Sequence, residues 1–115
     1  MKISILLPFK ENFSPSYAGA VSLNINDIVK YSKFKRNITV FGYTAYKKRF
    51  KNKYINIETK KRLFQSQNKD YINNFIELEK KVKSNIIELH NRPIYLKYLV
   101  NELQNKNYIL YFHND

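Results

Sequence analysis

Hydrophobic positions in this chain follow two spacings that alternate from one end to the other. Short runs rich in hydrophobic and β-branched residues, which are typical of strands, occupy residues 3–7, 37–42, 54–57, 85–90 and 108–112. Stretches in which hydrophobic residues recur every three or four positions predict helices over 21–31, 68–83 and 93–105. Segment 59–67 follows neither spacing. The pattern therefore predicts five strands and three helices.

Each predicted helix has one side that we expect to be buried. The expected buried residues are Val21, Ile25, Ile28 and Val29 in the first helix, Tyr71, Ile72, Phe75, Ile76, Leu78 and Val82 in the second, and Leu96, Leu99, Val100 and Leu103 in the third. In the second helix, Lys and Glu residues are expected on the opposite, solvated side.

Strands separated by helices or long crossovers imply right-handed βαβ units. We therefore expect an α/β fold with a doubly wound, mostly parallel, Rossmann-like sheet of about five strands in the order 3-2-1-4-5. A length of 115 residues fits a single domain, 1–115, with one modest core. The third strand is short and alternates in polarity, so it is expected near an edge.

Polar side chains follow three of these strands. Ligands of such sheets bind beyond the carboxyl ends of the strands, at the switch point between the first and fourth strands. The residues expected there are Lys10, Glu11 and Gly19 after the first strand, Glu88, His90, Asn91 and Arg92 at the end of the fourth, and His113, Asn114 and Asp115 after the fifth. Both histidines of the chain fall at this rim, which makes it the candidate site.

The residue types at this rim suggest two kinds of chemistry. Gly19 and Ala20 begin a helix, where unpaired N–H groups favour an anion such as a phosphate; tight strand–helix packing without a ligand is an equal alternative. A histidine beside such a site can take a proton from a hydroxyl. The alternative for His90 and His113 is a buried, hydrogen-bonded imidazole. A metal site is disfavoured, because no cysteine and no closely spaced histidine pair is present.

The formal net charge of +12 favours an anionic partner: nucleic acid, an anionic membrane or a phosphorylated substrate. A compositional explanation is favoured over this one, because 17 Lys outnumber 4 Arg in a chain also rich in Asn and Ile. The basic loop 43–53, with Tyr43, Tyr46 and Phe50, has the composition of a single-stranded nucleic-acid groove. Aromatic residues packing back onto the sheet are the favoured alternative.

No apolar run approaches the roughly 20 residues of a membrane span, and the chain has no cysteine. We therefore expect a cytoplasmic protein. Its basic surface would allow peripheral, weak association with the inner, anionic face of the membrane.

Three segments carry a family resemblance. They are ILLPFKENFSPSYAGAVSLNINDI (5–28), IIELHNRPIYLKYLV (86–100) and YILYFHND (108–115). Together they resemble the amino-terminal domain of the retaining family-four glycosyltransferases, which have the two-domain GT-B fold. Residues 42–83 carry no signature of this family.

The resemblance implies transfer of a sugar from a nucleotide-sugar donor to a hydroxyl of a saccharide or lipid-linked acceptor, in cell-surface polysaccharide or lipopolysaccharide synthesis. It implies that Gly19, with Ala20, lies near the donor pyrophosphate and that His90 is catalytic, beside the reacting sugar. Lys10 and Glu11 would lie in the cleft, with Arg92, His113, Asn114 and Asp115 on its acceptor side. No cofactor is implied.

The nucleotide-sugar pocket of this family belongs to a second domain, and its amino-terminal domain is longer than 115 residues. We therefore expect a fragment, a truncated product or one half of a split enzyme that is silent alone, with strand 108–112 as an exposed edge. A second hypothesis is a small basic module that binds nucleic acid or an anionic membrane surface. A third is a non-enzymatic subunit that completes another chain's cleft.

Charge placement separates the first two hypotheses. Lysines gathered on one face, with Tyr46 and Phe50 exposed, favour a binding module. Scattered lysines, with His90 and Gly19 facing one cleft, favour the transferase.

Overall fold

A computed structural model describes residues 1–60 and 66–113. Five parallel strands form one sheet in the order β3-β2-β1-β4-β5, as predicted. The strands are β1 (Ile3–Leu6), β2 (Ile38–Gly42), β3 (Tyr54–Asn56), β4 (Ile86–His90) and β5 (Asn107–Tyr111). The helices are α1 (Ala20–Tyr31), α2 (Gln67–Val82) and α3 (Ile94–Glu102), with a short 3₁₀ turn η1 (Lys35–Asn37).

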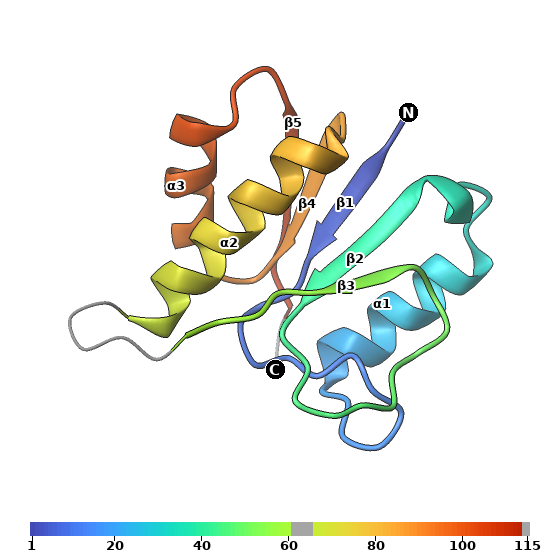
Figure 1. Ribbon diagram of the computed structural model, residues 1–115. Helices are drawn as coiled ribbons and strands as arrows, with labels where there is room; N and C mark the ends of the chain where they lie inside the picture. The colour runs from blue at the N-terminus through green and yellow to red at the C-terminus, as the bar shows by residue number, and fades with distance from the viewer. Residues whose placement is uncertain (61–65, 114–115) are drawn as a thin grey trace.

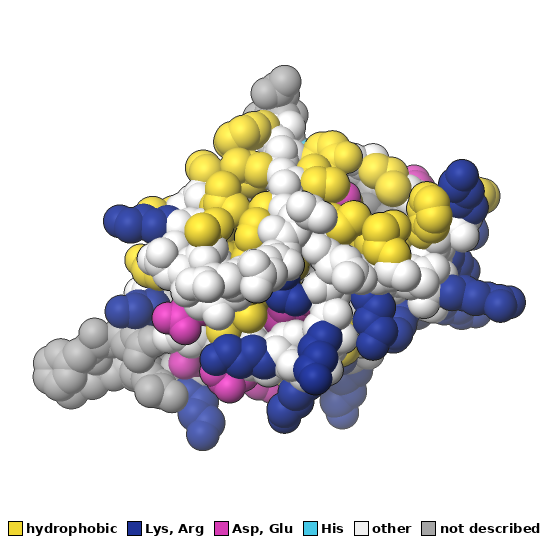
Figure 2. Space-filling view, turned by 90° about the horizontal axis from the view of Figure 1, so that it is seen from above, with side chains coloured by type: hydrophobic (Ala, Val, Ile, Leu, Met, Phe, Trp, Pro, Cys, Tyr) yellow, Lys and Arg dark blue, Asp and Glu magenta, His cyan; other side chains and the backbone are white. Residues whose placement is uncertain are grey.

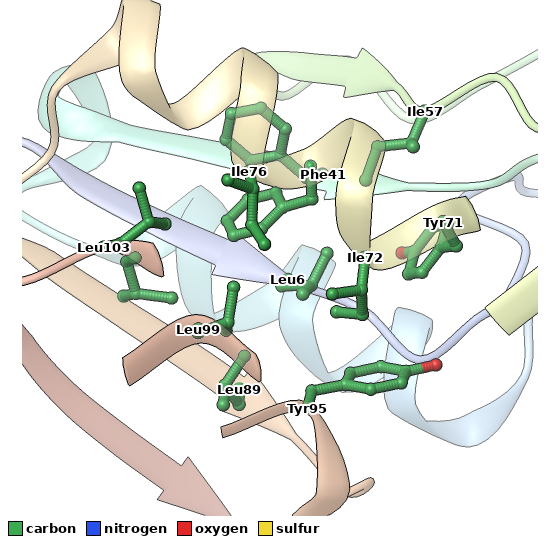
Figure 3. Packing of buried hydrophobic residues seen from close by; sticks show 12 residues of the cluster. Leu6, Phe41, Ile57, Tyr71, Ile72, Ile76, Leu89, Tyr95, Leu99 and Leu103 are labelled. Atoms are coloured by element: carbon green, nitrogen blue, oxygen red, sulfur yellow. The ribbon is translucent and has the colours of Figure 1, made fainter. Parts of the chain in front are cut away.

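Helices cover both faces of the sheet, which gives a doubly wound, Rossmann-like α/β fold (Figure 1). On one face, α2 and α3 bury a large cluster that includes Leu6, Phe41 and Leu89 of the sheet (Figure 3). On the other face, α1 packs through Val21, Ile25 and Val29 against hydrophobic residues of β1 and β2. Strand β1 is buried between β2 and β4, so its carboxyl end lies at the middle of one rim.

Most predicted elements are confirmed, with ends that differ by a few residues. The largest difference is in α3, which ends at Glu102 rather than near Asn105. Leu103, the next residue, has a φ of −121° and a ψ of 86°, outside the helical region, and Asn105 has a left-handed φ of 64°. The undecided segment 59–67 contributes the first residue of α2, and its residues 61–65 lie outside the described part of the chain.

Two residues expected to be buried are exposed. Ile28 of α1 is 52% exposed, because the buried stripe of this helix follows Val21, Ile25 and Val29. Val100 of α3 is 48% exposed, because the four-residue spacing of Tyr95, Leu99 and Leu103 meets the core instead. The narrower contact stripe of each helix explains both errors.

Glu79 of α2 was expected on the solvated side but is fully buried. Its carboxylate accepts hydrogen bonds from Ser4 Oγ of β1 at 2.9 Å and from the Ser84 backbone N–H at 2.9 Å. The Lys106 Nζ lies 3.4 Å from Glu79 Oε1. These partners compensate the burial of the charge and fasten α2 to the rim opposite the candidate site.

Hydrophobic and basic side chains lie in separate regions on one face of the molecule. Seen from above, hydrophobic side chains gather on one side of this face, while the visible Lys and Arg side chains lie mostly along the opposite side and the two edges (Figure 2). Strand β5 is a sheet edge; its residues Ile109 and Tyr111 are 40% and 48% exposed, and Phe112 just after it is 67% exposed. The expectation of an exposed last strand is therefore met within the described residues.

Candidate functional site

The carboxyl ends of β1, β4 and β5 meet at one rim, and the loops that leave them enclose a pocket. Leu6 of β1 pairs with Leu89 of β4, and His90 at the end of β4 pairs with Tyr111 of β5. The pocket has a volume of about 420 Å³ and is lined by Pro8, Phe9, Lys10, Glu11, Val21, Asn91, Arg92 and His113. The pocket lies at the predicted switch point, beside β1, where the chain stops adding strands on one side of the sheet and begins adding them on the other.

Two buried tyrosines hold the loop after β1. The Tyr71 hydroxyl of α2 donates to the Leu7 carbonyl at 2.6 Å, and the Phe9 N–H donates to the Tyr95 hydroxyl at 3.3 Å. Burial raises the pKa of both tyrosines, so both hydroxyls stay protonated and can donate. The Tyr95 hydroxyl in turn donates to Asn68 Oδ1 at 2.8 Å. The larger core cluster thus fixes one wall of the pocket.

Glu11 caps the beginning of α1. The Ser22 N–H donates to Glu11 Oε1 at 3.0 Å, while Gly19 at the N-cap position offers no side chain of its own. A Cβ at Gly19 would overlap the same oxygen. The absence of a side chain at Gly19 therefore makes room for the Glu11 carboxylate.

This cap occupies the place that the sequence assigned to a donor phosphate. An anion does sit at the start of α1, but it belongs to the chain itself. A phosphate beside Gly19 and Ala20 would have to displace Glu11, because two anions at one helix end repel each other. The phosphate role of Gly19 and Ala20 stays a prediction.

Strained backbone gathers at this pocket. Lys10, Asn91 and Arg92 have φ values of 70°, 56° and 53°, in the left-handed region that side chains other than glycine rarely adopt. Lys10 lies in a turn closed by the Glu11 N–H and the Pro8 carbonyl at 3.1 Å. Such residues cluster at functional sites, where the surrounding structure holds them in place. The backbone conformation thus supports a site at this pocket separately from the chemistry of its side chains.

The two histidines lie in direct contact behind the pocket. Glu88 Oε2 lies 2.7 Å from His90 Nε2, and His90 Nδ1 lies 2.7 Å from His113 Nε2. The Tyr111 ring stacks on His90 at 5.1 Å between centroids. The His90 side chain is 2% exposed, whereas His113 is half-buried and lines the pocket. The three side chains thus form a chain that leads from Glu88 in β4 through His90 to the pocket.

Asn91 ties the ends of β4 and β5 together. Its N–H donates to the Tyr111 carbonyl at 2.8 Å, and its Oδ1 accepts from the His113 N–H at 2.8 Å. The left-handed backbone of Asn91 makes this pair of contacts possible. The position of His113 is therefore set by backbone contacts as well as by His90.

The structure brings together five of the residues expected at the rim: Lys10, Glu11, Asn91, Arg92 and His113 all line the pocket. His90 does not line it and contacts it only through His113, so its assignment as the catalytic residue stays a prediction. Asn114 and Asp115 lie outside the described residues. Arg92 also borders a second hollow of about 450 Å³ between the beginnings of α2 and α3.

Sequence reasoning placed Glu88 and Asn91 at the rim without a role and missed Tyr111. The sequence does contain a signal for part of this cluster. Alternate residues of a strand share a face, so Glu88 and His90 point to one side of β4. The β4–β5 register then brings Tyr111 opposite His90 on that side. The sequence does not reveal how β4 and β5 are aligned, and this alignment is what brings Tyr111 beside His90.

Within residues 1–60 and 66–113, no group of three or more His, Asp or Glu residues could hold a metal ion. The same part of the chain contains no helix long and apolar enough to cross a membrane.

Comparison of the chain with protein-family models, with curated proteins and with solved structures finds no match.

Proposed function

We propose that this chain is the acceptor-side half of a retaining glycosyltransferase and that the rim pocket is its reaction site. One observation carries the proposal. Two cations, Lys10 and Arg92, and a half-buried imidazole, His113, converge from three loops on one pocket at the switch point of the sheet. A site of this kind suits a ligand that carries both a phosphate and a hydroxyl.

The proposed reaction exchanges one bond for another at the anomeric carbon of the sugar. The bond from this carbon to the donor phosphate oxygen breaks, and a bond to the acceptor oxygen forms. The acceptor hydroxyl loses its proton to His113, and the nucleoside diphosphate departs with the electron pair of the broken bond. Lys10 and Arg92 would stabilise the charge that develops on the phosphate.

The chain needs a donor-binding domain for this reaction, because the nucleotide contacts of the resembled family lie in its second domain. The other half would be supplied by further sequence of the same protein or by another chain. We therefore expect residues 1–115 to bind ligands weakly and to transfer no sugar alone. Sugar transfer by the purified 115-residue chain would contradict this part of the proposal.

Binding measurements test the assignment of the pocket. Saturation-transfer NMR with UDP-glucose, GDP-mannose and a panel of simple saccharides should detect weak binding to the 115-residue chain. Arg92→Ala should weaken this binding about tenfold, because a charge-assisted hydrogen bond contributes on the order of 1.5 kcal/mol. Lys97→Ala is the matched control, since Lys97 is an exposed lysine of α3 outside the pocket. Equal weakening by both variants would reject the pocket.

A second function is favoured by one separate observation. The rings of Tyr17 and Tyr46 stack at 4.5 Å and are 64% and 38% exposed, beside the basic residues of loop 43–53. An exposed aromatic pair flanked by lysines can stack the bases of a single-stranded nucleic acid. Against this function, Phe50 packs on Phe13, and basic residues lie on α1, η1, α2 and α3 as well as in loop 43–53.

Fluorescence anisotropy with a labelled single-stranded oligonucleotide separates the two functions. A nucleic-acid module would bind in a salt-dependent manner and lose affinity in Tyr46→Ala. The transferase proposal instead expects only weak charge attraction that Tyr46→Ala leaves unchanged.

A further inference from the structure

While both rings are neutral, the contacts of His90 allow only one direction of hydrogen bonding. A carboxylate only accepts hydrogen bonds, so His90 Nε2 must carry the proton that it shares with Glu88 Oε2 at 2.7 Å. In the neutral His90 ring, Nδ1 is then a bare acceptor. The His113 Nε2, 2.7 Å away, must therefore be the donor to His90 Nδ1.

The same argument determines the tautomer of His113. With Nε2 protonated, the neutral His113 ring has its lone pair on Nδ1. Among the described residues, Nδ1 has no hydrogen-bond partner, and His113 is the member of the chain that lines the pocket. The Glu88 carboxylate thus determines, through His90, which nitrogen of His113 is free to accept a proton.

We infer that Glu88 and His90 are positioning residues that hold His113 in one tautomer, with Nδ1 as the base of the pocket. The ligand group that it serves is a hydroxyl. On transfer, the O–H bond of the ligand breaks and the proton binds His113 Nδ1, which leaves an imidazolium hydrogen-bonded to His90 and, through it, to Glu88. This inference deepens the proposed function, which supplies the acceptor hydroxyl, but the tautomer itself does not depend on any ligand.

The geometry also limits the charge of the pair. Only one proton fits between His90 Nδ1 and His113 Nε2, so the two rings together hold at most one positive charge while they remain in contact. The charged groups nearby are Glu88 of β4, which contacts His90, and Lys10, Glu11 and Arg92, which line the same pocket as His113. Tyr111 of β5 faces His90 with its ring. A second positive charge on the pair would require a proton on both His90 Nδ1 and His113 Nε2, and these two protons would push the rings apart.

Nitrogen NMR of the histidine rings tests the inference on the whole chain without a ligand. We expect each ring at neutral pH to show one protonated Nε2 and one bare Nδ1, with a scalar coupling between His113 Nε2 and His90 Nδ1 across the hydrogen bond. Glu88→Gln should produce mixed tautomers and reduce this coupling, because an amide can donate to His90 Nε2 as well as accept from it. Glu77→Gln, on the exposed side of α2, is the control and should leave the ring signals unchanged.

Ring signals without coupling in the native chain, or signals that Glu88→Gln leaves unchanged, would overturn the inference. His90→Asn removes the ring that accepts from His113 and should abolish the coupling; amide spectra show whether either variant remains folded. If the predicted signals are found but no saccharide binds, the positioning role stands and the proposed function fails.

Discussion

At the scale of single residues, helix α1 begins at a glycine, and a carboxylate from the preceding loop caps its first turn. The sequence indicated an anion at Gly19 because a glycine at a helix start leaves N–H groups accessible. It did not indicate that Glu11 supplies the anion. That contact depends on how the loop after β1 folds back, and hydrophobic periodicity carries no information about such a loop.

Gly19→Ala tests this cap. The new methyl group would collide with the Glu11 carboxylate and push it from the Ser22 N–H, at a cost of about 1 kcal/mol in the free energy of unfolding. The backbone adds no strain, because Gly19 has an extended conformation with a φ of −75°. Urea unfolding of the native chain and the variant measures the difference.

Glu11→Ala provides the control for this prediction. In that background the collision is absent, so Gly19→Ala should cost almost nothing. An equal cost in both backgrounds would show that Glu11 is not the reason for the glycine.

The partly buried hydroxyl of Tyr54 should lower the free energy of unfolding at alkaline pH. Burial raises the pKa of Tyr54 to about 12, from an ordinary value of 10.0. Above pH 10 the unfolded chain loses this proton while the folded chain keeps it, so stability falls as pH rises from 10 to about 12. Thermal unfolding across this range should show a smaller fall for Tyr54→Phe than for the native chain. Parallel curves for the two proteins would contradict the assignment.

At the scale of secondary-structure elements, hydrophobic spacing predicted each strand and helix because a buried face repeats with the period of its element. The errors have the same origin. Spacing predicts that Ile28 and Val100 are buried, but it does not state how wide a stripe the neighbouring element covers. Spacing also treats Glu79 as a solvated residue, because its partners Ser4, Ser84 and Lys106 are remote in sequence.

Glu79→Ala should destabilise the fold strongly. The variant leaves Lys106 and two serines without their buried carboxylate partner. Removing one partner of a buried ion pair lowers the free energy of unfolding by about 3 kcal/mol. Chemical denaturation measures this change.

Glu77→Ala is the matched control on the same helix. Glu77 pairs with Lys80 at 3.4 Å on the exposed side, so its removal should cost about 0.5 kcal/mol or less. Similar effects of the two substitutions would show that the Glu79 network does not hold α2 in place.

At the scale of the whole molecule, the order of the strands was expected from right-handed βαβ units arranged in a doubly wound sheet. The rim site followed from that order, since it places the ends of β1, β4 and β5 together. The contact between His90 and His113 could not be predicted at this scale, because it depends on the register of β4 with β5.

The exposed edge at β5 should make the chain self-associate. Residues 107–112 carry no charge, and an uncharged, hydrophobic edge strand presents unpaired backbone groups to other chains. Sedimentation velocity should show association that increases with protein concentration and that Ile109→Lys suppresses. Leu23→Lys, at an exposed hydrophobic residue of α1, should have a smaller effect. A monomer at all concentrations would contradict the prediction.

The rim pocket is proposed to receive a ligand with both phosphate and hydroxyl groups. Backbone amide NMR of the labelled chain during a titration with UDP-glucose tests this assignment. We expect shifts confined to the pocket, at Lys10, Glu11, Arg92, His113 and the beginning of α1. Shifts centred on Tyr46 and loop 43–53, or no shifts at all with every saccharide nucleotide tried, would contradict it.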